Sequence, residues 1–180
     1  MLGAGSSETL GRGDCLAAIL SEREEVVLTL IGQQTHEWLN SGNSATVIQA
    51  AATKRYPEED VQLAIELLAR KGYLKVSFRS FLQLTADGYY AYAGANVPDF
   101  ADLLQRVDME LCKNQHTSND EVIRNLQADP TAINYIFDML CQNGTIDNGN
   151  HGVPLAGGGP HWHIMTLSPE FRIKCREMQP

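Results

Sequence analysis

A nine-residue junction occurs twice in the chain. Residues 66–74 read ELLARKGYL, and residues 138–146 read DMLCQNGTI. Each stretch has the pattern of an apolar helix end, then Gly, then the start of a strand. Gly72 and Gly144 stand where a helix can end in the left-handed conformation, which Gly adopts without steric cost. The repeat predicts two copies of one structural unit, each passing from a helix through Gly into a strand.

Alignment of the two glycines extends the repeat backwards. The apolar residues before each Gly fall on the same positions and have the i, i+3, i+4, i+7 spacing of a one-sided helix. They are Val61, Ala64, Ile65 and Leu68 in the first copy, and Ile133, Ile136, Phe137 and Leu140 in the second. The spacing predicts a core-facing helix in each copy.

Two further helices are expected before each of these. Leading helices are predicted over residues 21–40 and 99–114, and second helices over 44–52 and 118–126. Ser21 with Glu24, and Ser118 with Glu121, have capping-box spacing, and Ser44 can cap the second helix of the first copy. Val27, Leu30, Ile31 and Trp38 lie near one face of the first leading helix. Pro57 and Pro130 suit turns or first helical turns.

This order of elements resembles the winged-helix superfamily. Residues 46–88, TVIQAAATKRYPEEDVQLAIELLARKGYL…LQLTADG, are similar to its helix-turn-helix followed by a two-stranded wing and an LT–G closure. Residues 118–170 look like a more divergent copy, with 23 residues instead of 12 between the Gly and the closing Leu of the wing. The resemblance covers about residues 22–175. It implies a mainly α fold with small β-wings (α+β), made of two tandem winged-helix units.

Three regions follow from that resemblance. Residues 1–20 are expected to be a flexible tail with a short apolar segment, because their Gly-rich start follows no strand and lacks a phosphate-loop motif. Residues 21–95 form the first predicted domain. Residues 96–180 form the second, with a wing extended by the Gly-rich and Pro-rich stretch 148–160.

The helix that reads DNA in winged-helix proteins corresponds here to the helix before each Gly. Reading bases in the major groove takes donors such as Arg, Lys, Asn or Gln. The outward residues are predicted to be Glu59, Gln62, Leu63 and Glu66 in the first copy, and Thr131, Asn134, Tyr135 and Asp138 in the second. Because acidic groups repel phosphates, these faces favour a protein partner over DNA.

The charge distribution leaves room for one alternative. The chain has a net charge of −8. Residues 1–37 and 96–180 carry net charges of −4 and −5, and residues 38–95 carry +1. The middle segment holds Lys54, Arg55, Arg70, Lys71, Lys75 and Arg79. These residues could contact phosphates beside the helix-turn-helix and in the wing. The favoured interpretation is simpler: Arg70 and Lys71 suit a helix C-terminus, and the others are solvated surface.

The sequence HWH (residues 161–163) falls on the predicted last strand. Because side chains alternate along a strand, His161 and His163 share one side and, with His151, are candidate ligands of a metal ion. The favoured alternative is that His161 and His163 are two partly buried strand histidines, because no acidic residue or Cys has clear ligand spacing here. Counting back by twos from Leu167 places Trp162 and Ile164 on the outward side. An exposed Trp beside an Ile is typical of a partner-binding anchor, although the long loop or the other unit could cover both.

The remaining features narrow the class of protein. No apolar run approaches the roughly 20 residues that span a bilayer. The four cysteines (Cys15, Cys112, Cys141 and Cys175) are widely spaced, which favours reduced thiols in a cytoplasmic protein. No catalytic pairing stands out, so neither an enzyme nor a cofactor is expected.

The sequence thus predicts a non-enzymatic interaction, assembly or regulatory module. Its partner is another protein or a second copy bound through the leading helix. The alternative is a DNA-binding transcriptional regulator that uses the basic wing of the first unit.

Overall fold

A computed structural model describes most of the chain. It covers residues 19–35, 42–77, 80–114, 117–152 and 161–178, and the side chains of 148–152, 161–163 and 165 lie outside this description. Within the described residues the fold is mainly helical, with two small antiparallel sheets of two strands each. The predicted class, mainly α with small β elements, is confirmed.

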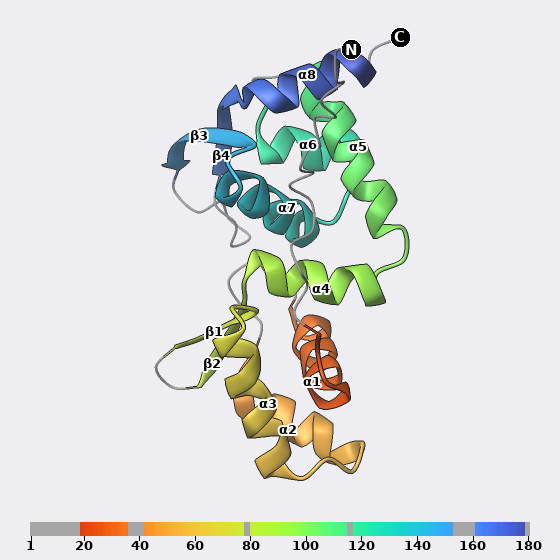
Figure 1. The fold of residues 1–180 in the computed structure, drawn as a ribbon, viewed down its shortest axis with the longest axis vertical. Helices are drawn as coiled ribbons and strands as arrows, with labels where there is room; N and C mark the ends of the chain where they lie inside the picture. The colour runs from red at the N-terminus through yellow and green to blue at the C-terminus, as the bar shows by residue number, and fades with distance from the viewer. Residues whose placement is uncertain (1–18, 36–41, 78–79, 115–116, 153–160, 179–180) are drawn as a thin grey trace, which may run out of the picture.

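The same order of elements occurs in both halves of the chain (Figure 1). The first half has α1 (Glu22–Gln33), α2 (Ser44–Thr53), α3 (Glu58–Arg70), β1 (Leu74–Ser77), β2 (Phe81–Leu84) and α4 (Ala86–Asn96). The second has α5 (Phe100–Lys113), α6 (Asn119–Leu126), α7 (Pro130–Gln142), β3 (Ile146–Gly152), β4 (His161–Leu167) and α8 (Pro169–Met178). The predicted unit ended at its second strand, and the structure adds a helix, α4 or α8, to each.

The repeated junction has the same backbone geometry in both halves. Gly72 and Gly144 follow α3 and α7 with φ angles of 82° and 73°. A side chain is strained in this left-handed region, and Gly is not. The prediction of a left-handed Gly between helix and strand is confirmed at both positions.

A second joint closes each hairpin onto this junction. The N–H of Thr85 donates to the carbonyl of Tyr73 (3.1 Å), and the N–H of Ser168 donates to that of Thr145 (2.8 Å). Thr85 also caps α4 by accepting from the N–H of Gly88 (3.1 Å). A Cβ added at Gly88 would lie 2.0 Å from the Tyr73 carbonyl oxygen. The close approach of helix and strand explains why Gly occupies this position.

Helix capping follows the sequence with one exception. Ser21 and Ser118 form complete capping boxes with Glu24 and Glu121, as predicted. The predicted cap at Ser44 is wrong, because Asn43 caps α2 by accepting from the N–H of Thr46 (2.9 Å). A bridge to Phe81 pairs Asn43 with β2. This pairing keeps Asn43 extended and lets the helix begin at the next residue.

The second hairpin differs from the first in having two irregularities of register. In the β1–β2 hairpin the register is regular, and Leu82 and Leu84 of β2 are both buried. In the β3–β4 hairpin, Asp147 pairs with Thr166 but Asn148 pairs with Ile164. Two steps along β4 therefore match one step along β3. The extra residue is a β-bulge, which shifts the alternation of side chains.

The bulge corrects one prediction. Ile164 was expected to point outward, but its side chain is only 3% exposed. Its N–H donates to the carbonyl of Thr117 (3.1 Å), as the N–H of Leu82 donates to that of Gly42 (3.0 Å). Ile164 thus occupies the position of Leu82, a core residue. Counting by twos from Leu167 fails because it passes through the bulge.

Helix α4 lies between the two halves. Figure 1 shows it between the group of α1, α2, α3 and the first hairpin and the group of α5 to α8 with the second hairpin. It contacts α1 and β2 on one side and α5 and α7 on the other. The predicted boundary between residues 95 and 96 falls at the end of this shared helix. One continuous set of buried apolar residues runs through both halves.

A disulfide fixes the last helix. Cys112 of α5 and Cys175 of α8 are bonded, with their Cα atoms 5.1 Å apart. The prediction of reduced thiols is therefore wrong for these two cysteines. Spacing along the chain misled it, because α5 and α8 are packed side by side and an ion pair between Lys174 and Asp108 (2.5 Å) also joins them. The expectation of a cytoplasmic location rested on reduced thiols and loses that support.

Candidate functional site

The outer face of α3 is the main exposed surface that the sequence analysis singled out. Val61, Ala64, Ile65 and Leu68 are buried, as predicted. The opposite side chains are exposed, also as predicted: Glu59, Gln62, Leu63 and Glu66. Three acidic residues fill the first turn of α3, where they stabilise the helix dipole. The face is therefore acidic, with a single large apolar side chain in its middle.

A hollow adjoins this face between α3 and the start of α1. Its volume is about 330 Å³. It is lined on the α3 side by Asp60, Leu63, Ala64 and Leu67, and on the α1 side by residues 21–24. An exposed ion pair between Arg23 and Asp60 (2.9 Å) crosses from one helix to the other. No pattern in the sequence marks this hollow, because it depends on how α1 packs against α3.

The corresponding face of α7 is not exposed. Thr131, Asn134 and Tyr135 are buried and Asp138 is half-buried, so the prediction of an outward face is wrong. The ring of Tyr135 stacks on that of Tyr89 in α4, with centroids 4.3 Å apart and planes 7° apart. Asn134 accepts a buried hydrogen bond from Asn119 of α6 (2.8 Å). The unpredicted helix α4 covers Tyr135, and α6 contacts Asn134, so most of this face is buried.

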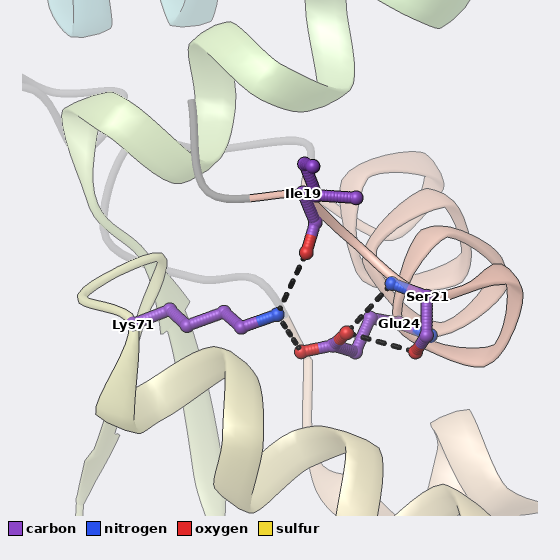
Figure 2. A network of polar contacts seen from close by, with 4 residues as sticks. All are labelled: Ile19, Ser21, Glu24 and Lys71. Carbon is purple, nitrogen blue, oxygen red and sulfur yellow. Dashed lines mark hydrogen bonds and ion pairs between the residues drawn. The ribbon is translucent and has the colours of Figure 1, made fainter. Parts of the chain in front are cut away.

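Lys71 lies at the surface, but its ammonium is bound within the protein. Its Nζ lies 2.6 Å from Oε1 of Glu24 and donates to the carbonyl of Ile19 (3.1 Å). Oε2 of Glu24 accepts from the N–H (2.7 Å) and the hydroxyl (2.8 Å) of Ser21. Figure 2 shows these four residues joining the start of α1 to the end of α3. The network is structural, because Glu24 is only 3% exposed.

This network predicts an acid-sensitive contribution to stability. Burial raises the pKa of the Glu24 carboxyl, but hydrogen bonds from Lys71 and Ser21 outweigh it and hold the pKa below its ordinary value of 4.5. A lowered pKa in the folded state means that the stabilisation is complete above about pH 4.5 and is lost as the pH falls through the folded pKa. We expect Glu24→Gln to lower the free energy of unfolding by about 1–3 kcal/mol at neutral pH.

Urea denaturation of both proteins at about pH 7 and about pH 3 would check this expectation. The difference between wild type and Glu24→Gln should shrink at the lower pH. Glu25→Gln is the matched control, because Glu25 is exposed on the same helix. A difference that persists unchanged at low pH would contradict the assignment.

The other predicted cations are dispersed. Lys54 and Arg55 follow α2, Arg70 ends α3 and Lys75 lies in β1, and all four are exposed. Arg70 pairs with Glu66 at 3.8 Å. Arg79 lies outside the described residues. These positions belong to three different elements and not to one helix face.

The His-rich sequence lies in the second hairpin. His161, Trp162 and His163 belong to β4, and His151 of β3 pairs in register with Trp162. Their side chains lie outside the description, so the proposed metal and anchor roles stay predictions. Among the described residues, no group of three or more His, Cys, Asp or Glu side chains is placed to hold a metal ion.

The first hairpin carries two exposed apolar residues that the sequence analysis did not single out. Val76 of β1 and Phe81 of β2 are each about half exposed. Phe81 pairs with Ser77 and lies on the same face as the pair Lys75–Gln83. The buried pair Leu74–Leu84 lies on the opposite face. The alternation of residues 81–84 was the available signal, because it puts Phe81 out of phase with Leu82 and Leu84.

Three comparisons with known proteins gave no match: one with protein-family models, one with curated proteins and one with solved structures. Within the described part of the chain, every helix is too short or too polar to cross a bilayer.

Proposed function

We propose that each half of the chain is a winged-helix unit and that the protein is a non-enzymatic interaction or assembly module, which binds a protein partner on the outer face of α3. The observation that carries this proposal is the exposed, acidic character of that face, with Leu63 half exposed at its centre. Exposed leucines are ordinary when scattered. Leu63 instead borders a hollow, which gives a partner side chain somewhere to enter.

Electrostatics argue against DNA on this face. Most of the affinity of a DNA-binding protein comes from neutralising phosphates with Lys and Arg. The exposed face of α3 offers Glu58, Glu59 and Glu66 in their place. On the equivalent face of α7, Thr131, Asn134 and Tyr135 are buried, and Tyr135 stacks on Tyr89 of α4. The base-reading donor on the exposed face of α3 is Gln62, and its amide already donates to Glu58 (2.9 Å).

Self-association through the leading helix is the less favoured form of the proposal. The apolar residues Val27, Leu30 and Ile31 of α1 are buried within the chain. The residues that α1 exposes are polar: Glu22, Arg23, Glu25 and Gln33. A stable homodimer usually buries an apolar patch. The apolar side of α1 already packs within the chain, where α1 contacts α2, α3 and α4.

The alternative is a DNA-binding regulator that uses the first hairpin. Lys54, Arg55 and Lys75 are exposed and keep this alternative open. Lys71 no longer supports it, because its ammonium is bound to Glu24.

A DNA titration separates the two functions. With random duplex DNA at about 50 and 200 mM salt, we expect half-saturation at both concentrations to lie above roughly 100 µM. The matched control is a triple variant, Lys54→Glu, Arg55→Glu and Lys75→Glu, which should behave like wild type. Micromolar or tighter binding that weakens steeply with salt and disappears in the triple variant would overturn the proposal in favour of the regulator.

A further inference from the structure

The hollow between α1 and α3 has an apolar wall and an acidic surround. Leu63 is 50% exposed and Leu67 is half-buried. Residues four apart on a helix are neighbours on its surface, so the two leucines form a short apolar stripe along the hollow. Ala64 also lines the hollow and is buried, and its small side chain leaves space between the two helices. One large apolar side chain fits a volume of about 330 Å³.

Carboxylates flank this stripe on both sides. Glu59 lies four residues before Leu63 and Glu66 three residues after it, so both are surface neighbours of Leu63. Glu22 lines the hollow from α1. The helix dipole accounts for acidic residues in the first turns of α1 and α3, because it favours negative charge there. It accounts neither for Glu66, which lies beyond the first turn, nor for the exposure of Leu63.

The ion pairs already present on this surface are easily exchanged. Arg70 and Glu66 are both largely exposed and 3.8 Å apart. Arg23 and Asp60 are closer, at 2.9 Å, but the arginine is more than half exposed. Exposed pairs of this kind contribute little to stability, because water and salt screen them. A cationic partner can therefore replace either arginine at little cost to the fold.

We propose that this surface binds a short helical segment of another protein, with one large apolar side chain that enters the hollow and with Lys or Arg three or four residues to either side of it. The apolar residue packs on Leu63 and Leu67, and the cations meet Glu59 and Glu66. Charge complementarity selects this partner over a second copy of the chain, which carries a net charge of −8. The inference rests on the proposed function and adds the chemistry of the partner.

The test is a selection from a displayed library of random peptides on the full-length protein. We expect the enriched peptides to share an apolar residue flanked by Lys or Arg at a spacing of three or four. Synthetic copies of these peptides should bind at least about tenfold more weakly to Leu63→Glu, and also more weakly to Glu59→Lys/Glu66→Lys. Their affinity for wild type should fall as salt is raised.

Ile173→Glu is the matched control, because Ile173 is a similarly exposed apolar side chain on α8 (55%) and lies outside the proposed surface. It should bind the peptides like wild type. Thermal unfolding of each variant would show that Leu63→Glu keeps the fold, as expected for a side chain that is half in solvent.

Several outcomes would overturn the inference. One is enrichment of uncharged or acidic peptides whose binding still depends on Leu63, which leaves the proposed protein-binding function standing while removing the basic partner. Another is equal binding to wild type and Leu63→Glu. Absence of enrichment, or a homodimer in light scattering that Leu63→Glu abolishes, would also overturn it. Failure of the proposed function itself would show separately, as salt-dependent binding to duplex DNA.

Discussion

Replacement of Cys112 and Cys175 by Ser is expected to lower the free energy of unfolding by about 4 kcal/mol. The bond joins residues 63 apart in sequence, so it closes a long loop. In the chain-entropy description, a crosslink stabilises the folded state by limiting the conformations of the unfolded chain, and the effect grows with loop length. Urea denaturation of the oxidised wild type and the double variant would measure the difference.

Two controls accompany this measurement. Wild type under reducing conditions should unfold like the double variant. Cys141→Ser should leave the stability close to that of wild type, because Cys141 takes no part in the Cys112–Cys175 bond. Equal stability of the oxidised wild type and the double variant would mean that α8 is not fastened to α5 by this bond in solution.

Tyr135→Ala should have an effect of similar size. Its side chain is only 1% exposed, and its ring stacks on that of Tyr89 where α7 meets α4. Removing a large buried ring leaves a cavity, and substitutions of this kind cost about 3–5 kcal/mol. The loss should appear as a lower urea midpoint. Because α4 also packs on α1 and β2, we expect the first half to be destabilised together with the second.

Tyr135→Phe is the matched control. It keeps the stacked ring and should cost no more than about 1.5 kcal/mol, the scale of one hydrogen bond. Far-ultraviolet circular dichroism together with tryptophan fluorescence would follow the unfolding of both halves, because each half has one tryptophan, Trp38 or Trp162. Stability of Tyr135→Ala within about 1 kcal/mol of wild type would contradict the burial of this face.

The parts of the fold that depend on near neighbours in sequence were predictable. The capping boxes at Ser21 and Ser118 need only residues three apart, and both are present. The left-handed glycines Gly72 and Gly144 were visible because a helix end and a strand start adjoin them. The buried and exposed faces of α3 follow from its 3.6-residue period.

The parts set by distant contacts were not predictable in the same way. Helix α4 follows its capping Thr85 and reads ADGYYAYAGAN, and its two glycines weaken any helical pattern. Without α4, the face of α7 with Tyr135 was expected to be exposed. One signal was available: Tyr135, Ile136 and Phe137 are consecutive, and a helix that is apolar all round is buried all round. The bond between Cys112 and Cys175 left no comparable trace in the spacing.

In the candidate site, too, the features of a single helix were predictable and those that depend on packing between helices were not. The exposure of Glu59, Leu63 and Glu66 followed from the period of one helix. The hollow beside Leu63 could not be predicted, because it exists only where α1 packs against α3. The predicted orientation of Ile164 was wrong because β4 has one inserted residue between Ile164 and Thr166. No periodic pattern in sequence marks such a bulge.

The position of α4 also has a consequence for the order in which the chain becomes structured during synthesis. Helix α4 ends at Asn96, and its partner α7 begins at Pro130. A growing chain therefore completes the side of α4 that carries Tyr89 before the helix that covers this ring has been made. The first half therefore emerges with this apolar side of α4 still exposed, and exposed apolar surface favours aggregation. Folding of the first half is thus completed only after α7 has been synthesised and covers the Tyr89 side of α4.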